Sequence, residues 1–315
     1  MAVTPVVCLM GPTASGKTEV ALQLAHEFPV DLISVDSAQV YRGMDIGTAK
    51  PDADLLRRVP HRLIDIRDPE ERYSAGEFVR DASAEIDASI KRGRIPLLVG
   101  GTMMYFRALT EGIAELPGAD ADIRAAIDGE AESAGWPALH CQLAEIDPQA
   151  AARINPNDSQ RIQRALEVFR LSGRSLSSWQ ARKSANSSSM RRQNKFLKVA
   201  LMVDSRAVLH ERISARWQIM LDAGFIEEVE TLMARRGLTA AHPSMRAVGY
   251  RQIWSYLDGR APREEASAKA LAATRQLAKR QLTWLRSEQN MISVNPLETD
   301  AQETIMTELR GHLII

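Results

Sequence analysis

Residues 10–21 read MGPTASGKTEVA, and the spacing within this segment leaves few folds open to the chain. Gly11, Gly16, Lys17 and Thr18 complete the pattern G-x-x-x-x-G-K-[ST], which follows an apolar, strand-like run and opens a helical run. This is the setting of a phosphate-binding P-loop. We expect backbone N–H groups of the loop to face phosphate oxygens, Lys17 to add a positive charge, and Thr18 to bind Mg²⁺.

Short β-rich runs alternate with helical patterns in the N-terminal part of the chain. The expected strands are PVVCLM, DLISVD, HRLIDI and RIPLLVGG, and KFLKVALMV is a further strand later on. A helix is expected from Lys17 to about Glu27, and another after Ser74, which stands in capping-box spacing with Glu77. The alternation predicts the α/β class: a P-loop NTPase-like parallel sheet flanked by helices, with right-handed crossovers.

The pattern becomes purely helical from about Asp120. Helices are expected to begin at Asp120 and at Asp158 or Ser159, and the second of them to end at Gly173. No strand-like run interrupts this part of the sequence. These features predict a helical subdomain that is inserted into the α/β domain.

The domain boundaries follow from these patterns. We expect a core domain of residues 1–118 and 196–315, which includes the C-terminal helices, and an inserted helical subdomain of residues 119–195. The segment 175–195 is Ser-rich and basic, which predicts a mobile loop or hairpin at the far edge of the subdomain. Residues 205–286 are expected to be mostly helical, with breaks at Gly224, Gly237 and Pro243.

Charge is balanced overall but unevenly distributed along the chain. The 315 residues include 40 basic and 40 acidic side chains. Residues 111–158 carry 10 acidic and 2 basic side chains, whereas 160–198 carry 10 basic and 1 acidic, and 246–286 carry 9 basic and 3 acidic. Segregated basic segments suggest a surface that faces a polyanion. Ordinary solvated helix faces explain the charges equally well.

Several classes of protein are disfavoured by the composition. The two cysteines, Cys8 and Cys141, are far apart and show no zinc-ligand or disulfide spacing. No apolar run approaches the roughly 20 residues of a membrane span. The apolar N-terminus has neither a preceding basic region nor a cleavage site, so we interpret it as a buried strand. We expect a cytoplasmic protein without a membrane partner, and a monomer.

The residue that would bind Mg²⁺ in a phosphoryl-transfer P-loop protein is missing. Such proteins usually hold the ion with an acidic residue at the end of a second strand. Here that strand, IPLLVGG, ends in Gly-Gly-Thr. The acidic residue at a strand end is instead Asp36, at the sheet edge where open α/β folds bind ligands. The loop therefore suits holding a diphosphate as a leaving group better than hydrolysing one.

Two candidate residues also have a purely structural interpretation. Asp36 could cap a turn, although its place beside a P-loop favours a chemical role. Thr102 could cap the helix TMMYFRAL or contact a substrate, and the sequence favours neither. The run MMYF is interpreted as core. The histidines, among them His61, show no ligand spacing and are assigned no chemistry.

Seven segments together resemble the tRNA dimethylallyltransferase family: GPTASGKT, DLISVDSAQVYRGMDIGTAKP, PHRLIDI, RIPLLVGGTMMYFRAL, NPNDSQRIQRALEVF, SMRAVGYRQIWSYL and ATRQLAKRQLTWLR. The resemblance spans residues 6–287. It implies transfer of a dimethylallyl group from dimethylallyl diphosphate to N6 of adenosine 37, beside the anticodon, in tRNAs that read codons starting with U. It further implies Mg²⁺ as cofactor and diphosphate as product.

The resemblance also implies roles for individual residues. The catalytic set would be Asp36, which accepts the proton of the adenine amine, Thr102 near the target nucleotide or the diphosphate, and Arg216 as a clamp on the diphosphate. The diphosphate would be bound by Gly11, Thr13, Ala14, Ser15, Gly16, Lys17 and Thr18, with Thr18 at the metal. The tRNA anticodon stem-loop would be bound by Asp36, Ser37, Ala38, Gln39, Thr102, Arg124, Gln160, Arg161, Arg164, Arg246, Gly249, Tyr250, Arg251, Lys279, Arg280 and Arg286. Residues 184–195 resemble the family least.

The implied chemistry makes physical demands on the fold. Adenosine 37 must flip out of the anticodon loop to be reached. A closed tunnel between the sheet and the helical insertion would keep water from the allylic carbon. On the last long helix, Arg275, Lys279 and Arg286 lie within about 40° of one another around the helix axis. Leu277 and Trp284 lie on roughly the opposite face. We expect the basic side to follow a phosphate backbone and the other side to pack.

Three other functions are compatible with parts of the sequence. A P-loop kinase would use Asp36 as base towards a hydroxyl group and would consume ATP. A prenyltransferase acting on free AMP or ADP would share the N-terminal half, but the basic segments and inserted helices disfavour it. A non-enzymatic RNA-binding protein with a P-loop would form no product.

Overall fold

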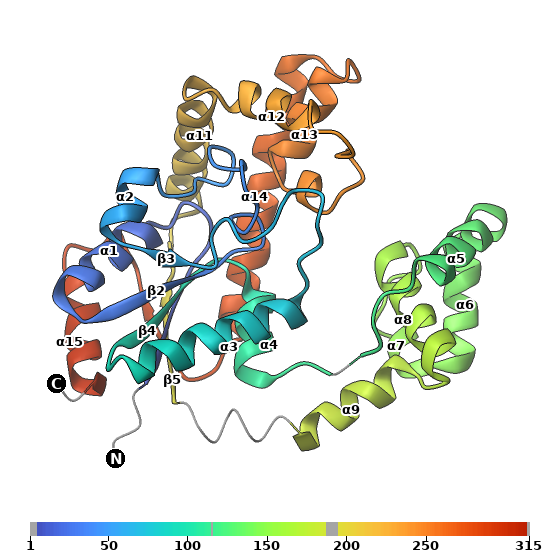
Figure 1. Ribbon diagram of the computed structural model, residues 1–315, viewed down its shortest axis with the longest axis horizontal. Helices are drawn as coiled ribbons and strands as arrows, with labels where there is room; N and C mark the ends of the chain where they lie inside the picture. The colour runs from blue at the N-terminus through green and yellow to red at the C-terminus, as the bar shows by residue number, and fades with distance from the viewer. Residues whose placement is uncertain (1–4, 115, 187–194, 314–315) are drawn as a thin grey trace. The chain divides into compact units, whose positions relative to one another are not determined.

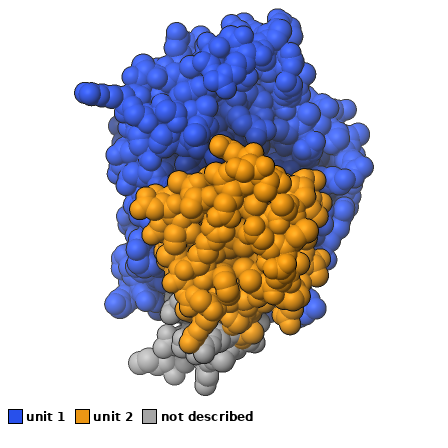
Figure 2. Space-filling view, turned by 90° about the vertical axis from the view of Figure 1, so that its right-hand side faces the viewer, with its two compact units in different colours: residues 1–110, 193–315 blue, residues 111–192 orange. Residues whose placement is uncertain are grey.

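The computed structural model describes residues 5–114, 116–186 and 195–313 (Figure 1). The chain divides into two compact units, which Figure 2 colours separately. Unit 1 consists of Met1–Thr110 and Gln193–Ile315, and unit 2 of Glu111–Arg192. Unit 2 overlaps the inserted subdomain that was expected at 119–195. No helix among the described residues is both long and apolar enough to cross a membrane.

Unit 1 is built on a six-stranded parallel sheet with the strand order β3-β2-β4-β1-β5-β6. The strands are β1 (Val6–Met10), β2 (Val30–Val35), β3 (His61–Arg62), β4 (Ile95–Gly100), β5 (Phe196–Leu201) and β6 (Met291–Val294). In the centre, Leu9 of β1 is in register with Val99 of β4 and Val199 of β5. The predicted α/β class with a P-loop NTPase-like sheet is confirmed.

Helices cover both faces of this sheet (Figure 1). On one face, α1 (Lys17–Glu27) and α15 (Ala301–Leu313) pack against the strands, and on the other α3 (Ala75–Lys91) and α4 (Met103–Glu111) do so. The two innermost strands, β1 and β4, are covered from both sides, which fits their apolar runs VVCLM and IPLLV. The capping box of Ser74 and Glu77 at the start of α3 is present, as expected.

The C-terminal helices form a second apolar core within unit 1. They are α11 (Arg206–Asp222), α12 (Phe225–Met233), α13 (Tyr250–Leu257) and α14 (Arg263–Ser287), with a 3-10 turn at Ser244–Arg246. Phe225 stands edge-on to both Trp217 and Tyr250 at the centre of this core. Val40 and Met44, from the segment between β2 and α2 (Ala53–Arg58), are buried in the same core. This packing ties the segment after β2 to the C-terminal helices.

All the regular secondary structure among the described residues of unit 2 is helical. It contains α5 (Ala121–Ala134), α6 (Trp136–Ile146), α7 (Pro148–Ala151), α8 (Ser159–Ser172) and α9 (Leu176–Asn186). Ile127, Leu139 and Ile162 are fully buried in its core. Three predicted helix ends agree with the structure: α5 begins after Asp120, α8 begins after Asp158, and α8 ends at Gly173. Each of these ends depends on a local cap.

Three local predictions differ from the structure. The run HRLIDI forms a strand only at His61–Arg62, because Leu63 and Asp65 adopt positive φ angles of 64° and 55°. The segment 175–195 was expected to be a loop or hairpin, but its first part is helix α9, and residues 187–194 lie outside the described residues. Strand β6 and helix α15 at the C-terminal end were not predicted from the sequence.

Candidate active site

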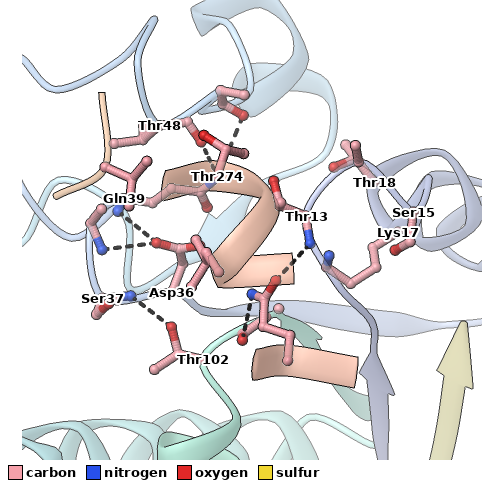
Figure 3. A pocket seen from close by; sticks show the side chains of 18 of the residues that line it. Thr13, Ser15, Lys17, Thr18, Asp36, Ser37, Gln39, Thr48, Thr102 and Thr274 are labelled. Atoms are coloured by element: carbon pink, nitrogen blue, oxygen red, sulfur yellow. Dashed lines mark hydrogen bonds between the residues drawn. The ribbon is translucent and has the colours of Figure 1, made fainter. Parts of the chain in front are cut away.

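A cavity of about 710 Å³ opens at the carboxyl ends of β1, β2 and β4, and every residue that lines it belongs to unit 1. Figure 3 shows the P-loop on one side of the cavity and the turn after β2 on another. The following predicted site residues line it: Thr13, Ala14, Ser15, Gly16, Lys17, Thr18, Asp36, Ser37, Ala38, Gln39, Thr102, Arg216, Arg246, Tyr250 and Arg280. Parallel strands end on the same edge of a sheet, which explains why loops so far apart in sequence meet here.

The P-loop turns tightly between β1 and α1. A Cβ atom on Gly11 would lie 2.6 Å from the Ser15 hydroxyl oxygen, so the turn requires glycine at this position. Ser15 is fully buried, and its hydroxyl has no hydrogen-bond partner among the described residues. A buried hydroxyl without a partner is costly, so this one is suited to bind a ligand.

Backbone N–H groups of the loop are also left without partners. Within the described part of the chain, no atom accepts a hydrogen bond from the N–H groups of Ala14, Gly16, Lys17 and Thr18. They lie at the N-terminal end of α1, where the helix dipole favours negative charge. The loop is therefore built to receive an anion with several oxygen atoms.

Two cations border the anion-binding loop. The Lys17 ammonium donates to the Pro12 carbonyl oxygen at 2.7 Å. Burial lowers the pKa of Lys17 to about 7, the Arg216 cation acts in the same direction, and Asp36 opposes them. Burial also lowers the pKa of Arg216, which makes no hydrogen bond or ion pair with a described residue. Both cations would gain from a bound anion.

Asp36 and Thr102 hold the turn after β2. Asp36 Oδ1 accepts hydrogen bonds from the N–H groups of Ala38 at 2.8 Å and Gln39 at 3.2 Å (Figure 3). Asp36 therefore does cap a turn, while its Oδ2 atom accepts no hydrogen bond from the described residues. The Thr102 hydroxyl accepts from the Ser37 N–H at 3.2 Å and does not cap its own helix, α4. Their catalytic roles stay predictions.

The Gly-Gly pair that ends β4 is explained by two close approaches. A Cβ atom on Gly100 would lie 2.1 Å from the Val35 carbonyl oxygen of β2, and one on Gly101 would lie 2.5 Å from Gln281 Nε2. A side chain at Gly100 would thus push β4 away from β2, and one at Gly101 would displace the Gln281 amide. An acidic residue at this strand end, as in phosphoryl-transfer proteins, does not fit.

Gln281 of α14 was missed by the sequence analysis. Its side chain is buried, its Oε1 accepts from the Thr13 N–H at 2.9 Å, and its Nε2 donates to the Gly101 carbonyl oxygen at 2.8 Å. A glutamine within a helix carries no sequence signal for such a role, because its partners are distant in the chain.

Glu228 of α12 was also missed. Its Oε2 accepts from the N–H groups of Asp45 at 2.9 Å and Ile46 at 2.7 Å, and its Oε1 from the Gly47 N–H at 3.2 Å and from the Tyr250 hydroxyl. One carboxylate thus fixes the segment after β2, which forms one wall of the cavity, to the C-terminal helices.

His61 lines the cavity, although the sequence analysis assigned it no chemistry. Its Nδ1 lies 2.7 Å from the Val59 carbonyl oxygen. Burial lowers the pKa of His61, so the ring is neutral near pH 7. A carbonyl oxygen can only accept, so Nδ1 carries the proton and Nε2 is an acceptor.

The expected packing side of α14 is confirmed only in part, because Trp284 packs against the core on one face of the sheet but also lines the cavity. Leu277 and Trp284 are both half-buried and line the cavity. The buried residues in this part of the helix are Ala278, Gln281, Leu282 and Leu285. One side of the helix therefore faces the cavity and another faces the core. The pattern of basic and apolar residues in the sequence does not distinguish these two sides.

The basic residues of α14 differ in their surroundings. Lys279, Arg280 and Arg286 are exposed, and Arg280 also lines the cavity. Arg275 is half-buried and donates to the Ser214 hydroxyl at 3.3 Å, so it does not belong to the exposed basic surface that was expected.

The predicted tRNA contacts near α13 include two buried residues. Arg246 and Arg251 are exposed. Gly249 and Tyr250 are buried, and the Gly249 N–H donates to Gln252 Oε1 at 2.9 Å. Tyr250 lines the cavity and also belongs to the apolar core of the C-terminal helices. Of these two buried residues, only Tyr250 lines the cavity.

Unit 2 holds the remaining predicted contacts. Arg124 donates to the fully buried carboxylate of Glu167 at 2.8 and 3.0 Å, and Arg164 donates to it at 2.7 Å. Burial by itself would raise the pKa of Glu167, but the hydrogen bonds from both arginines lower it below its ordinary value. Gln160 and Arg161 are exposed.

Known proteins resemble this chain over nearly its whole length. A family model described as IPP transferase matches residues 39–288. The tRNA dimethylallyltransferase 2 of Hahella chejuensis is 54% identical over 98% of this chain and 95% of its own length. The tRNA dimethylallyltransferase of Nitrosococcus oceani is 56% identical over 98% of both chains.

Solved structures agree with these sequence relatives. The tRNA isopentenylpyrophosphate transferase of Bacillus halodurans is 37% identical, with a TM-score of 0.71 over 99% of this chain and 97% of that one. A eukaryotic dimethylallyltransferase that acts on tRNA shares the fold, with a TM-score of 0.77 at 23% identity over 98% of this chain and 79% of that one. The P-loop, the cavity and these similarities together show that the chain belongs to the IPP transferase family, the tRNA dimethylallyltransferases.

Proposed function

We propose that the protein transfers a dimethylallyl group from dimethylallyl diphosphate to N6 of adenosine 37 in tRNAs that read codons starting with U. The products are N6-(dimethylallyl)adenosine and diphosphate. The observation that carries this proposal is that a P-loop with unpaired N–H groups and a carboxylate with an unpaired oxygen line the same cavity. One can hold a leaving group while the other accepts a proton.

The P-loop side stabilises the departing diphosphate. Negative charge grows on the diphosphate as the bond to the allylic carbon breaks. Unpaired N–H groups, the Lys17 ammonium and the Arg216 guanidinium border that position and are already oriented by the fold. Preorganised donors of this kind lower a barrier because they need little reorganisation during the reaction.

Asp36 acts as the general base in this proposal. The adenine amine is a poor nucleophile because its lone pair is delocalised into the ring, so the proton must leave as the C–N bond forms. The turn holds Oδ1 of Asp36 through two N–H groups, which fixes the carboxylate and leaves Oδ2 to receive the proton. General-base help of this kind contributes about 10² to 10⁴ in rate.

The metal proposed here is Mg²⁺, with Thr18 as its protein ligand. The Thr18 side chain lines the cavity next to the P-loop, and its hydroxyl is a hard oxygen donor of the kind that Mg²⁺ prefers. The described residues hold no group of three or more acidic, histidine or cysteine side chains that could bind a metal without help. Diphosphate oxygens and water would complete the coordination, and the bound ion would neutralise charge on the diphosphate.

Apolar side chains that line the cavity suit the allylic group and exclude water. Ile213, Trp217 and Met220 of α11 line the cavity, as do Leu277 and Trp284 of α14. Water would otherwise capture a cation-like allylic carbon. The adenine must flip out of the anticodon loop to enter, at a cost of a few kcal/mol.

The test is an assay of the purified protein with dimethylallyl diphosphate, Mg²⁺ and an anticodon stem-loop that carries adenosine 37. We expect one diphosphate released for each adenosine that gains a dimethylallyl group, as measured by mass spectrometry of the nucleosides. A phosphorylated product that requires ATP would show a kinase instead. Modification of free AMP or ADP in preference to the stem-loop would show a nucleotide prenyltransferase, and binding without any product would show an RNA-binding protein.

A further inference from the structure

Gln281 connects two loops that border the cavity. The residue is 8% exposed and lies on α14, whereas its hydrogen-bond partners follow β1 and β4. Its Oε1 accepts from the Thr13 N–H at 2.9 Å, and its Nε2 donates to the Gly101 carbonyl oxygen at 2.8 Å. Figure 3 marks the bond that Thr13 donates.

The chemistry of the two partners requires an amide. A backbone N–H can only donate and a backbone carbonyl can only accept, so the side chain between them must offer one acceptor and one donor. Glutamate lacks the donor, asparagine is one methylene shorter, and leucine or methionine offers neither. The partners also fix which end of the amide is oxygen. Because a Cβ atom on Gly101 would lie 2.5 Å from Gln281 Nε2, the glycine is needed for this approach.

A second bond extends this connection to Asp36. Thr102 follows Gly101 directly, and its hydroxyl accepts from the N–H of Ser37, which follows Asp36. The three loops at the ends of β1, β4 and β2 are thus connected in series by the side chains of Gln281 and Thr102. The loop after β1 is the P-loop, and the loop after β2 contains Asp36. Their spacing is fixed through Gln281.

We propose that Gln281 is a positioning residue that sets the P-loop at the correct distance from Asp36. This inference rests on the proposed function, in which the P-loop holds the diphosphate and Asp36 takes the proton. Gln281 takes up the Thr13 N–H and so leaves the following N–H groups of the loop to face the ligand. Misplacement of reacting groups by about 1 Å can cost about 10²-fold in rate.

The first test is Gln281→Met, which keeps the length of the side chain and removes both bonds. The KM for dimethylallyl diphosphate should rise at least tenfold and kcat should fall, because the P-loop is no longer fixed relative to Asp36. The affinity for the anticodon stem-loop should stay within twofold. Gln276→Met is the matched control, since Gln276 is exposed on the same helix, and its constants should equal those of the wild type.

A second variant reaches the same bond from the other side. Gly101→Ala should displace the Gln281 amide and change the kinetic constants in the same direction as Gln281→Met. Thermal unfolding of each variant is measured in parallel, and rates are expressed per folded protein. If neither variant folds, Gln281 supports the whole domain and the specific inference is wrong.

Binding of inorganic diphosphate in the presence of Mg²⁺, measured by titration calorimetry, separates this inference from the proposed function. We expect Gln281→Met to bind it at least tenfold more weakly than wild type and Gln276→Met. A folded Gln281→Met protein whose KM and diphosphate affinity stay within twofold of wild type overturns the positioning role. A wild type that binds diphosphate but does not modify the stem-loop overturns the proposed function and leaves the binding comparison valid.

Discussion

Charged groups are arranged differently in the cavity of unit 1 and in the core of unit 2. In unit 2 the Glu167 carboxylate is satisfied by hydrogen bonds from Arg124 and Arg164. In the cavity, Arg216 has no hydrogen-bond or ion-pair partner among the described residues, and one oxygen of Asp36 is likewise unpaired. A buried charge that keeps its partners does not burden the fold, whereas charges left unpaired cost stability and are suited to bind a ligand. The contrast separates a structural cluster from a reactive one.

The largest expected effect concerns the unpaired oxygen of Asp36. Asp36→Asn keeps an oxygen that can cap the turn but removes the base, so turnover should fall by about 10² to 10⁴. Affinity for the anticodon stem-loop should change less than twofold. Single-turnover kinetics and a binding titration measure both quantities.

Asp52→Asn is the matched control for this variant. Asp52 also caps a backbone N–H, that of Leu55, but it does not line the cavity. The control should keep wild-type turnover. Near-normal turnover of Asp36→Asn would remove Asp36 from the chemistry and would make it an ordinary turn cap, like Asp52.

The paired cluster of unit 2 should respond in stability. Glu167→Gln leaves two partly buried arginines without a counter-charge, and because they are about a quarter exposed the loss should be below the roughly 3 to 5 kcal/mol of a fully buried pair. Because the pKa of Glu167 is lowered in the folded state, this contribution is present at neutral pH and is lost as the pH falls through that lowered value. Chemical denaturation at pH 7 measures the effect.

Glu130→Gln provides the comparison within the same unit. Glu130 pairs with Arg170 where both side chains are partly exposed, so its loss should cost less than about 1 kcal/mol. Equal stability losses for Glu130→Gln and Glu167→Gln would contradict the special status of the buried cluster.

Lys17 should take up a proton when the ligand binds. Burial lowers its pKa to about 7, and a bound diphosphate would raise the pKa again. At pH 8 the free protein therefore holds much of Lys17 neutral, and binding of dimethylallyl diphosphate should take up a large fraction of one proton. Calorimetry in buffers of different ionisation enthalpy measures the uptake. Lys17→Arg, which stays protonated, should bind without it, and equal uptake in both proteins would disprove the assignment.

The smallest expected effect concerns the exposed basic residues of α14. Replacement of Lys279 and Arg280 by alanine should weaken tRNA binding. It should also make the slope of log K against log salt concentration less steep, by roughly 0.7 to 0.9 for each lost phosphate contact. Lys269→Ala is the control, because Lys269 is exposed on the same helix but pairs with Glu265. An unchanged slope in the double variant would mean that this side of α14 does not meet tRNA.

Features that depend on neighbouring residues could be predicted from the sequence. The P-loop, the capping box of Ser74 and Glu77, and the helix starts after Asp120 and Asp158 are local signals, and each lies where it was expected. The extent of β3 could not be predicted, because it ends where Leu63 adopts a positive φ angle, which no residue type at that position indicates.

The parts of the cavity that depend on distant contacts could not be predicted. Gln281 and Glu228 bind backbone groups that are more than a hundred residues away, and nothing in their own segments marks them. Leu277 looks like a packing residue by helical periodicity, yet it lines the cavity, and Trp284 both packs against the core and lines the cavity. Apolar character predicts burial but does not distinguish a core from the wall of a binding site.

A crystal structure with a non-reactive analogue of dimethylallyl diphosphate, Mg²⁺ and an anticodon stem-loop would test the central claim most directly. We predict diphosphate oxygens within hydrogen-bond distance of the N–H groups of Gly16, Lys17 and Thr18, and the amine of the flipped adenine within hydrogen-bond distance of Asp36 Oδ2. A diphosphate bound away from the P-loop, or an adenine amine out of reach of Asp36, would contradict the account.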